Sequence, residues 1–422
     1  MKTNKSTFNV LESVGKHIEA LKPLLPKQAI VCIGEYPIKI LLKEPIASKT
    51  DGTLPILIGK SSDDIYKWIP EGFDPYFILG FEDSNIDTHF WYNILSFISK
   101  DDALIESLKK KSIEKLHGAI ITASVWDGIG SASLPTLISK FKASNINSLA
   151  LAILPSKIQP TDAQFNAFAS LGMCSSIEGA TVLLADRDHL ESYESVDRKG
   201  SLIKGNSIAN YLVNLLLTKE TVAQEISELS RTFNVKMYTV LLVTGASYKI
   251  YGSLENMLNT ALLKPLLTFD LSSASLLYVL LRMPLSLKDK LPRGKIELAI
   301  ADWFKEKANL KSIYITEPIY TEDMSDRIDA VLFVGGFDTS KMFSDLENKV
   351  KSLKNQAVEK GFMTEDWQVM TKTEDETKNT ETQTIIDTPK NVEESKTVNK
   401  PKRVRRTQKA DTKKRIDDTK NR

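Results

Sequence analysis

The chain has few of the residues that build disulfide or metal sites. Its 422 residues include two cysteines, Cys32 and Cys174, both in apolar or small-residue surroundings, and four scattered histidines. This composition predicts buried free thiols in a reducing compartment and argues against a disulfide framework or a zinc site. We predict no metal-ligating set of side chains.

Long apolar runs are also missing. No run reaches the roughly 18 residues that a membrane-spanning helix needs, and the stretch after Met1 is mixed-polar where a secretion signal would be apolar. We therefore expect a cytoplasmic location. The remaining composition is that of an ordinary globular protein with enough length for two or three domains.

The formal net charge of +2 hides a strong asymmetry. Residues 396–422 hold twelve Lys or Arg and three Asp or Glu, and residues 371–395 hold seven Asp or Glu and three Lys, so the body before them carries 2 − 9 + 4 = −3. The tail is rich in Thr, Glu, Lys and Asn and is predicted to be disordered. Its basic end favours non-specific attraction to anionic surfaces, because no aromatic residues are interleaved.

Apolar runs alternate with amphipathic stretches along the body, which is typical of a parallel sheet covered by helices. We predict five regions: an N-terminal helical extension over 1–28, an α/β domain over 29–205, a long central helix over 206–230, a smaller α/β domain over 231–362, and the tail over 363–422, acidic and then basic.

The most informative segment runs from Gly118 to Pro135. An apolar strand ends there in a small-residue turn, and a helix follows. Gly128 and Gly130 would let the backbone approach an anion, and Ser131 adds a hydroxyl beside the helix N-terminus. The same glycines could instead serve only to turn a strand into a helix.

Four segments in this order resemble the tubulin/FtsZ superfamily of cytoskeletal GTPases. Residues 126–135 (WDGIGSASLP) resemble the family's GGGTGTGAAP phosphate loop, and residues 180–190 (ATVLLADRDHL) resemble its strand followed by NDRL. Asn210, on the long helix, falls at the position that contacts guanine in the family, and residues 326–337 (DRIDAVLFVGGF) are similar to the last major strand.

The resemblance implies a tubulin/FtsZ-like fold that binds GTP or GDP, with Mg²⁺, and assembles head to tail into filaments. The residues that would contact the nucleotide are Gly34, Gly128, Gly130, Ser131 and Asn210. Asn210 could equally be a satisfied polar residue of the core. The resemblance also implies a tail that recruits protein partners; the basic end adds an anionic membrane or a nucleic acid as candidate partners.

The sequence departs from the family where the chemistry lies. After Gly34, where the family continues its glycine turn, this chain has Glu35, Tyr36 and Pro37, which would repel or block phosphate. Phe165 falls where the family has an arginine, and Arg187 falls where it has an asparagine.

The family's hydrolysis loop, NxDxxD, is matched best by residues 268–273 (TFDLSS). Asp270 survives as the candidate catalytic residue, and Ser273 replaces the second carboxylate, so any GTP hydrolysis should be slow or absent. Asp270 could also cap a helix. The loop arrives late in the chain, so we expect the strand at 234–244 and the helix at 253–263 to belong to an insertion.

We interpret the chain as a divergent tubulin/FtsZ-like protein that binds GTP and assembles into filaments. The alternative is a pseudo-GTPase scaffold that docks other cytoskeletal or division proteins. A tether acting through residues 396–422 is a third class, and a Rossmann-type oxidoreductase is disfavoured because no Gly-x-Gly-x-x-Gly follows the first strand.

Overall fold

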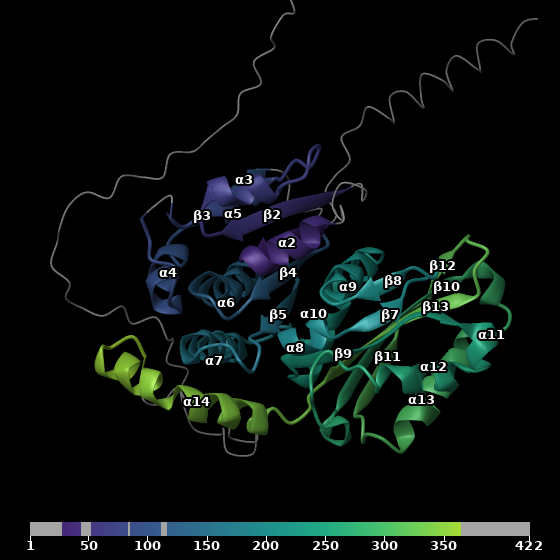
Figure 1. The fold of residues 1–422 in the computed structure, drawn as a ribbon. Helices are drawn as coiled ribbons and strands as arrows, with labels where there is room; N and C mark the ends of the chain where they lie inside the picture. The colour runs from purple at the N-terminus through teal and green to yellow at the C-terminus, as the bar shows by residue number, and fades with distance from the viewer. Residues whose placement is uncertain (1–27, 44–51, 83–84, 111–115, 364–422) are drawn as a thin grey trace, which may run out of the picture. The chain divides into compact units, whose positions relative to one another are not determined.

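The computed structural model describes residues 28–43, 52–82, 85–110 and 116–363 (Figure 1). The predicted N-terminal helical extension lies outside this part of the chain, apart from residue 28, and so does the predicted disordered tail, apart from residue 363. No helix in the described part is long and apolar enough to cross a membrane.

A mixed sheet forms the centre of the fold. Its strands in order across the sheet are β11 (Ser312–Ile315), β10 (Leu276–Pro284), β13 (Arg327–Gly335), β9 (Met237–Ser247), β6 (Val182–Asp186), β5 (Ser148–Leu154), β4 (Gly118–Ser124), β1 (Gln28–Ile33), β2 (Thr53–Gly59) and β3 (Phe77–Gly80), with β12 (Ile319–Thr321) also beside β10. Only β13 runs antiparallel to its neighbours. The predicted α/β class with a mostly parallel sheet is confirmed.

The strands read as continuous apolar runs because both faces of the sheet are covered. Within β1, the side chains of Ala29, Val31 and Ile33 face one core, and those of Ile30 and Cys32 face the other. The first core includes helices α4 (Trp91–Ile98), α6 (Gly128–Ala143), α7 (Thr161–Ser176), α12 (Leu254–Ala261), α13 (Arg293–Lys305) and α14 (Ser340–Glu359). The second includes α2 (Glu35–Lys43), α3 (Ser62–Trp68), α9 (Ser207–Leu217) and α10 (Val222–Phe233).

The strand over 234–244, which we expected to belong to an insertion, instead lies within the sheet and pairs its first half with its second. It forms β9, which pairs in parallel with β6 over three residue pairs from Val182–Met237 to Leu184–Thr239. The buried Thr239 hydroxyl also donates to the carbonyl of Leu184 at 3.1 Å. One continuous sheet therefore runs through both predicted α/β domains, whose exact boundaries remain a prediction.

The predicted single central helix is wrong, because two helices occupy its place. Helix α9 ends at Leu217, α10 begins at Val222, and the loop between them is held by Gln28, whose amide donates to the carbonyls of Lys219 and Glu220 at 3.2 and 2.9 Å. The hydroxyl of Thr218 donates to the carbonyl of Leu215 and so satisfies the end of α9. The apolar periodicity continues across the break, which is why the sequence pattern did not reveal it.

A buried polar cluster ties α9 to the second half of the sheet. Asp329 lies at an irregularity in the β13–β9 pairing and is fully buried. Its carboxylate forms an ion pair with Arg282 at 2.6 Å and accepts hydrogen bonds at 2.8 Å from the Tyr211 hydroxyl and the Gly245 backbone N–H. All three partners lose their acceptor if this carboxylate is removed.

We predict that Asp329→Ala lowers the free energy of unfolding by about 3–5 kcal/mol, because it leaves the Arg282 guanidinium buried without its counter-ion. Denaturant unfolding of the full chain would measure the change. Glu297→Ala is the control: it breaks the half-exposed Arg293–Glu297 pair and should have a far smaller effect. Equal losses in the two variants would contradict this account.

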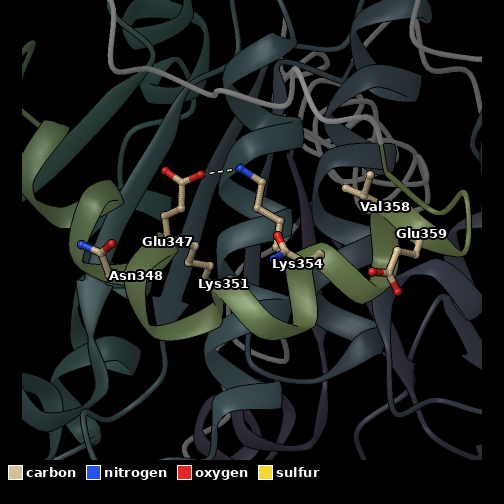
Figure 2. Close-up of a pocket in the computed structure, with 7 residues that line it drawn as sticks. Glu347, Asn348, Lys351, Lys354, Val358 and Glu359 are labelled. Atoms are coloured by element: carbon tan, nitrogen blue, oxygen red, sulfur yellow. Dashed lines mark hydrogen bonds and ion pairs between the residues drawn. The ribbon is translucent and has the colours of Figure 1, made fainter.

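Helix α14 returns from the second half of the sheet to pack beside α7 (Figure 1). A hollow along α14 is lined, among the residues that the structure describes, by side chains of this helix between Glu347 and Glu359 (Figure 2). Lys354 forms an ion pair with Glu347 there and lies 5.7 Å from the ring centre of Phe168 on α7. These contacts serve to pack α14 onto α7.

Candidate functional site

The candidate site lies where the order of strands in the sheet reverses. The chain passes from β1 outward to β2 and β3, then returns to β4 on the other side of β1 and continues to β5 and β6. The carboxyl ends of β1 and β4 therefore lie side by side while the loops that follow them diverge, and ligands of open α/β sheets bind in the crevice at such a point. Helices α2 and α6 both begin there.

Gly34 ends β1 at this point, with a φ of +91° that favours glycine. A Cβ atom on Gly34 would lie 2.3 Å from the Ser124 hydroxyl oxygen, so glycine is needed for the close approach of this turn to the end of β4. Glu35 and Tyr36, which we predicted to form part of a turn, are the first residues of α2, and Pro37 is tolerated in its first turn.

Gly128 and Gly130 begin α6, which starts earlier than its apolar periodicity suggested. A Cβ atom on Gly130 would lie 1.7 Å from the carbonyl oxygen of Ser124, and one on Gly128 would lie 2.6 Å from the carbonyl oxygen of Thr88. Both glycines are therefore required for packing whatever the site binds. Ser131 is fully buried, and its hydroxyl donates to the carbonyl of Gly128 at 3.2 Å.

Asp127 caps α6 from the turn after β4. One carboxylate oxygen accepts the Gly130 N–H at 2.7 Å, and the other accepts the Ser124 hydroxyl at 3.1 Å. The Gly128 N–H donates to the carbonyl of Thr88 at 3.2 Å. Burial raises the pKa of Asp127 to about 6, although its hydrogen bonds lower it, and nearby Glu35 adds to the rise. The sequence signal that we overlooked is an Asp three residues before Gly130, a common N-cap pattern.

Side chains from four separate elements meet across the crevice. The rings of Tyr36 and Trp126 are 5.0 Å apart in an edge-to-face arrangement. The guanidinium carbon of Arg187, the first residue of α8 (Arg187–Glu191), lies 5.2 Å from the centre of each ring. The Tyr36 hydroxyl donates to the side-chain oxygen of Asn206 at the start of α9. Sequence patterns did not predict that these four residues meet.

The other predicted residues lie in different surroundings. Asn210 is buried in α9, where its side-chain oxygen accepts a 2.8 Å hydrogen bond from Asn214 and its amide nitrogen has no partner in the described part of the chain. Phe165, at the family's arginine position, is a core residue whose ring packs near those of Phe90 and Trp91. No cluster of three His, Cys, Asp or Glu suited to a metal ion occurs among the described residues.

Asp270 lies away from the crevice. It caps the short helix η3 (Leu271–Ser273) by accepting from the backbone N–H and the hydroxyl of Ser272 at 3.0 and 2.7 Å, as the capping alternative predicted. Because β10 begins after it and runs parallel to β9, Asp270 lies at the amino edge of the sheet, opposite the crevice. The Thr218–Thr221 stretch lies at the same edge, beside Gln28.

The sequence matches no protein-family model and no curated protein. Among solved structures, the fold is similar to CetZ from Methanosaeta thermophila, with a TM-score of 0.60 and 15% identity over 80% of this chain and 94% of that chain. It is also similar to a GTPγS-bound protofilament of CetZ2 from Haloferax volcanii, with a TM-score of 0.55 and 16% identity over 78% and 99% of the two chains. FtsZ from M. jannaschii matches with a TM-score of 0.53 and 14% identity over 77% and 92%.

These similarities identify the fold as that of the tubulin/FtsZ superfamily of cytoskeletal proteins. The predicted resemblance is confirmed at this level, and the low identity fits a divergent sequence. Identity in this range is evidence for the fold alone, so the activity has to be argued from the residues of the crevice.

We predict that the Asp127→Asn variant gains stability relative to the wild type as the pH rises from 4.5 to 7.5, by about 1–3 kcal/mol. The folded wild type holds the Asp127 proton more tightly than the unfolded chain, because its pKa is raised. The protonated carboxyl therefore stabilises the folded wild type at low pH, and this stabilisation is lost as the pH rises through about 6. Asparagine caps the helix equally well and does not ionise, so the variant keeps its stability.

Urea unfolding of both proteins at the two pH values measures this difference. Asp188→Asn is the matched control, because hydrogen bonds from Ser156 and Lys157 lower the pKa of Asp188. This control should show no gain over the same interval. A constant difference between Asp127→Asn and the wild type would contradict the assignment.

Proposed function

We propose that the chain is a tubulin/FtsZ-like cytoskeletal subunit that assembles head to tail without holding GTP, as a pseudo-GTPase scaffold. The observation that carries the proposal is the bridge across the crevice, in which Tyr36, Trp126 and Arg187 contact one another and the Tyr36 hydroxyl also donates to Asn206. Burial, with a further contribution from Glu191, raises the pKa of Tyr36, so its hydroxyl stays a neutral donor to Asn206 at any physiological pH.

GTP, with Mg²⁺, is the ligand that the fold implies, and the residues present do not fit its phosphates. The first turn of α6 already uses its N–H groups on Asp127 and Thr88. The carboxylate of Asp127 would repel the phosphate charges, and the carboxylate of Glu35, which is exposed and forms an ion pair with Lys39, would add to the repulsion. For these reasons we do not propose that Gly34, Gly128, Gly130 or Ser131 contacts phosphate in the wild-type chain.

Head-to-tail assembly is supported by the arrangement of the two edges of the sheet. The crevice lies at the carboxyl edge, and the carboxylates of Glu220 and Asp270 lie at the amino edge, so a stack in one direction would bring different surfaces together. Such heterologous contacts produce open filaments when the rotation between successive subunits does not close a ring. One similar structure, CetZ2 from Haloferax volcanii, is a protofilament.

Hydrolysis has little support at this edge. The stretch from Thr218 to Thr221, between α9 and α10, lies at the same edge as Asp270, and its only carboxylate is Glu220. The loop predicted by sequence offers only Asp270, which caps η3. In either loop a single carboxylate replaces the family's pair, so we propose that GTP turnover is absent or very slow. The tail, over residues 363–422, is proposed to recruit protein partners, an anionic membrane or a nucleic acid.

GTP binding remains the second candidate, and one observation favours it. The buried amide of Asn210 has a donor without a partner among the described residues, and an unpaired buried donor is costly. It lies one helical turn beyond Asn206, so opening of the Tyr36–Asn206 contact would expose both amides to a planar base. CetZ1 from Haloferax volcanii, which has a similar fold, is a GDP-bound monomer in its solved structure.

Equilibrium binding of fluorescently labelled GTP to the full chain, with and without Mg²⁺, distinguishes the two candidates. We expect no saturable binding up to about 100 μM, which corresponds to a binding free energy weaker than roughly 5.5 kcal/mol. Binding in the micromolar range that Asn210→Ala abolishes would establish the second candidate and overturn the pseudo-GTPase proposal.

Self-association is predicted to be independent of nucleotide. The fraction of protein that sediments, and the filaments seen by electron microscopy, should be the same with GTP, with GDP and after treatment with a chelator and a phosphatase. Asp270→Ala should leave GTP turnover at background, and the same background is expected for the wild type. Assembly that requires GTP, or that GTP hydrolysis reverses, would refute this prediction.

A further inference from the structure

The N-terminus of α6 has the geometry of an anion site, but its donors are already engaged. This helix is 16 residues long and begins directly after the end of β4, with Gly34 and Gly130 keeping the surrounding backbone close. The N–H groups of a first helical turn point outward along the axis and carry a partial positive charge. Here they are directed at Asp127 and at the carbonyl of Thr88.

Asp127 is bonded in the way that a bound oxyanion would be. Its two carboxylate oxygens have different partners, the Gly130 N–H on one side and the Ser124 hydroxyl on the other. The Ile129 N–H also donates to it. The bonds from the first turn are those of an N-cap, and the bond from the Ser124 hydroxyl also ties the end of β4 to the start of α6.

We propose that Asp127 acts as a built-in anionic ligand of α6, which excludes phosphate by occupying its donors. This inference deepens the proposed function and rests on it for the interpretation of the crevice. Occupied donors and simple charge repulsion predict different results for two kinds of substitution at Asp127. Emptying the position should create a phosphate site, whereas neutralising Asp127 with its shape retained should not.

The ligand class is a tetrahedral oxyanion, and the probe is inorganic phosphate. The N–H groups released from Asp127, together with the Ser124 hydroxyl, would offer donors from two sides. Glu35 remains nearby and opposes the anion, so the affinity should be weak, in the millimolar range. Chloride at matched ionic strength accounts for general salt effects.

The experiment follows the thermal unfolding of the full chain in 50 mM phosphate and in matched chloride. We expect phosphate to raise the melting temperature of Asp127→Ala by about 2–4 °C, because a ligand that binds only the folded state stabilises it. The wild type and Asp127→Asn should show no such rise, since a carboxylate or amide oxygen still occupies the donors. Asp127→Gly is the second variant in case the alanine variant does not fold, because glycine at a cap costs only a few tenths of a kcal/mol.

Glu35→Gln is the matched control, since it removes a neighbouring negative charge and leaves the cap in place. It should behave like the wild type. A phosphate response in Asp127→Asn or Glu35→Gln equal to that of Asp127→Ala would show that charge, and not occupancy, excludes phosphate. The absence of a response in both Asp127→Ala and Asp127→Gly would also overturn the inference. Failure of the proposed function would be seen separately, as GTP binding by the wild type.

Discussion

The hydrogen bonds between β6 and β9 are the constraint on which the rest of the structure depends. Three residue pairs join strands that belong to different halves of the chain. Because strands in a sheet are held about 4.8 Å apart, this joint fixes the carboxyl and amino edges of both halves relative to each other. The crevice at one edge and the carboxylates of Glu220 and Asp270 at the other are thereby parts of a single rigid frame.

Further contacts connect the two halves of the sheet. The carboxylate of Asp329 connects α9 to β9, β10 and β13, and α14 extends from the second half back to α7. At the end of the described chain, the ring of Phe362 stacks on Tyr92 of α4 with 4.1 Å between the ring centres. The halves are thus connected through the sheet, through the Asp329 cluster that joins α9 to the sheet, and through α14.

The turns after β1 and β4 have a glycine framework like that of phosphate sites, and side chains of the chain itself occupy it. Gly34, Gly128 and Gly130 are all needed to bring the backbone of β1, β4 and α6 together. The same close approach serves phosphate binding in other α/β proteins. In this chain Asp127 takes up the donors, and the rings of Tyr36 and Trp126 with Arg187 fill the space between α2 and α8. A familiar glycine pattern is therefore compatible with a turn whose backbone donors are already engaged by the chain itself.

The fold could be predicted from the sequence more fully than the site. Runs such as the one that forms β4 are mostly apolar or small, and their alternation with helices indicates a parallel sheet. The break between α9 and α10 escaped prediction because no Pro or Gly marks it and the apolar stripe continues. The meeting of Tyr36, Trp126, Arg187 and Asn206 depends on contacts between residues up to 170 positions apart, as for Tyr36 and Asn206, which local patterns do not encode.

An anion that is covalently part of the chain cannot be exchanged or consumed. Subunits that carry a nucleotide differ according to whether it has been hydrolysed, and this difference records how long each has been in a polymer. In the proposed nucleotide-free polymer, with Asp127 in that place, an old subunit and a new one would be chemically identical. The polymer that we propose would have no internal record of the age of its subunits, and its turnover would have to be imposed from outside, by the supply of protein or by a partner of the tail.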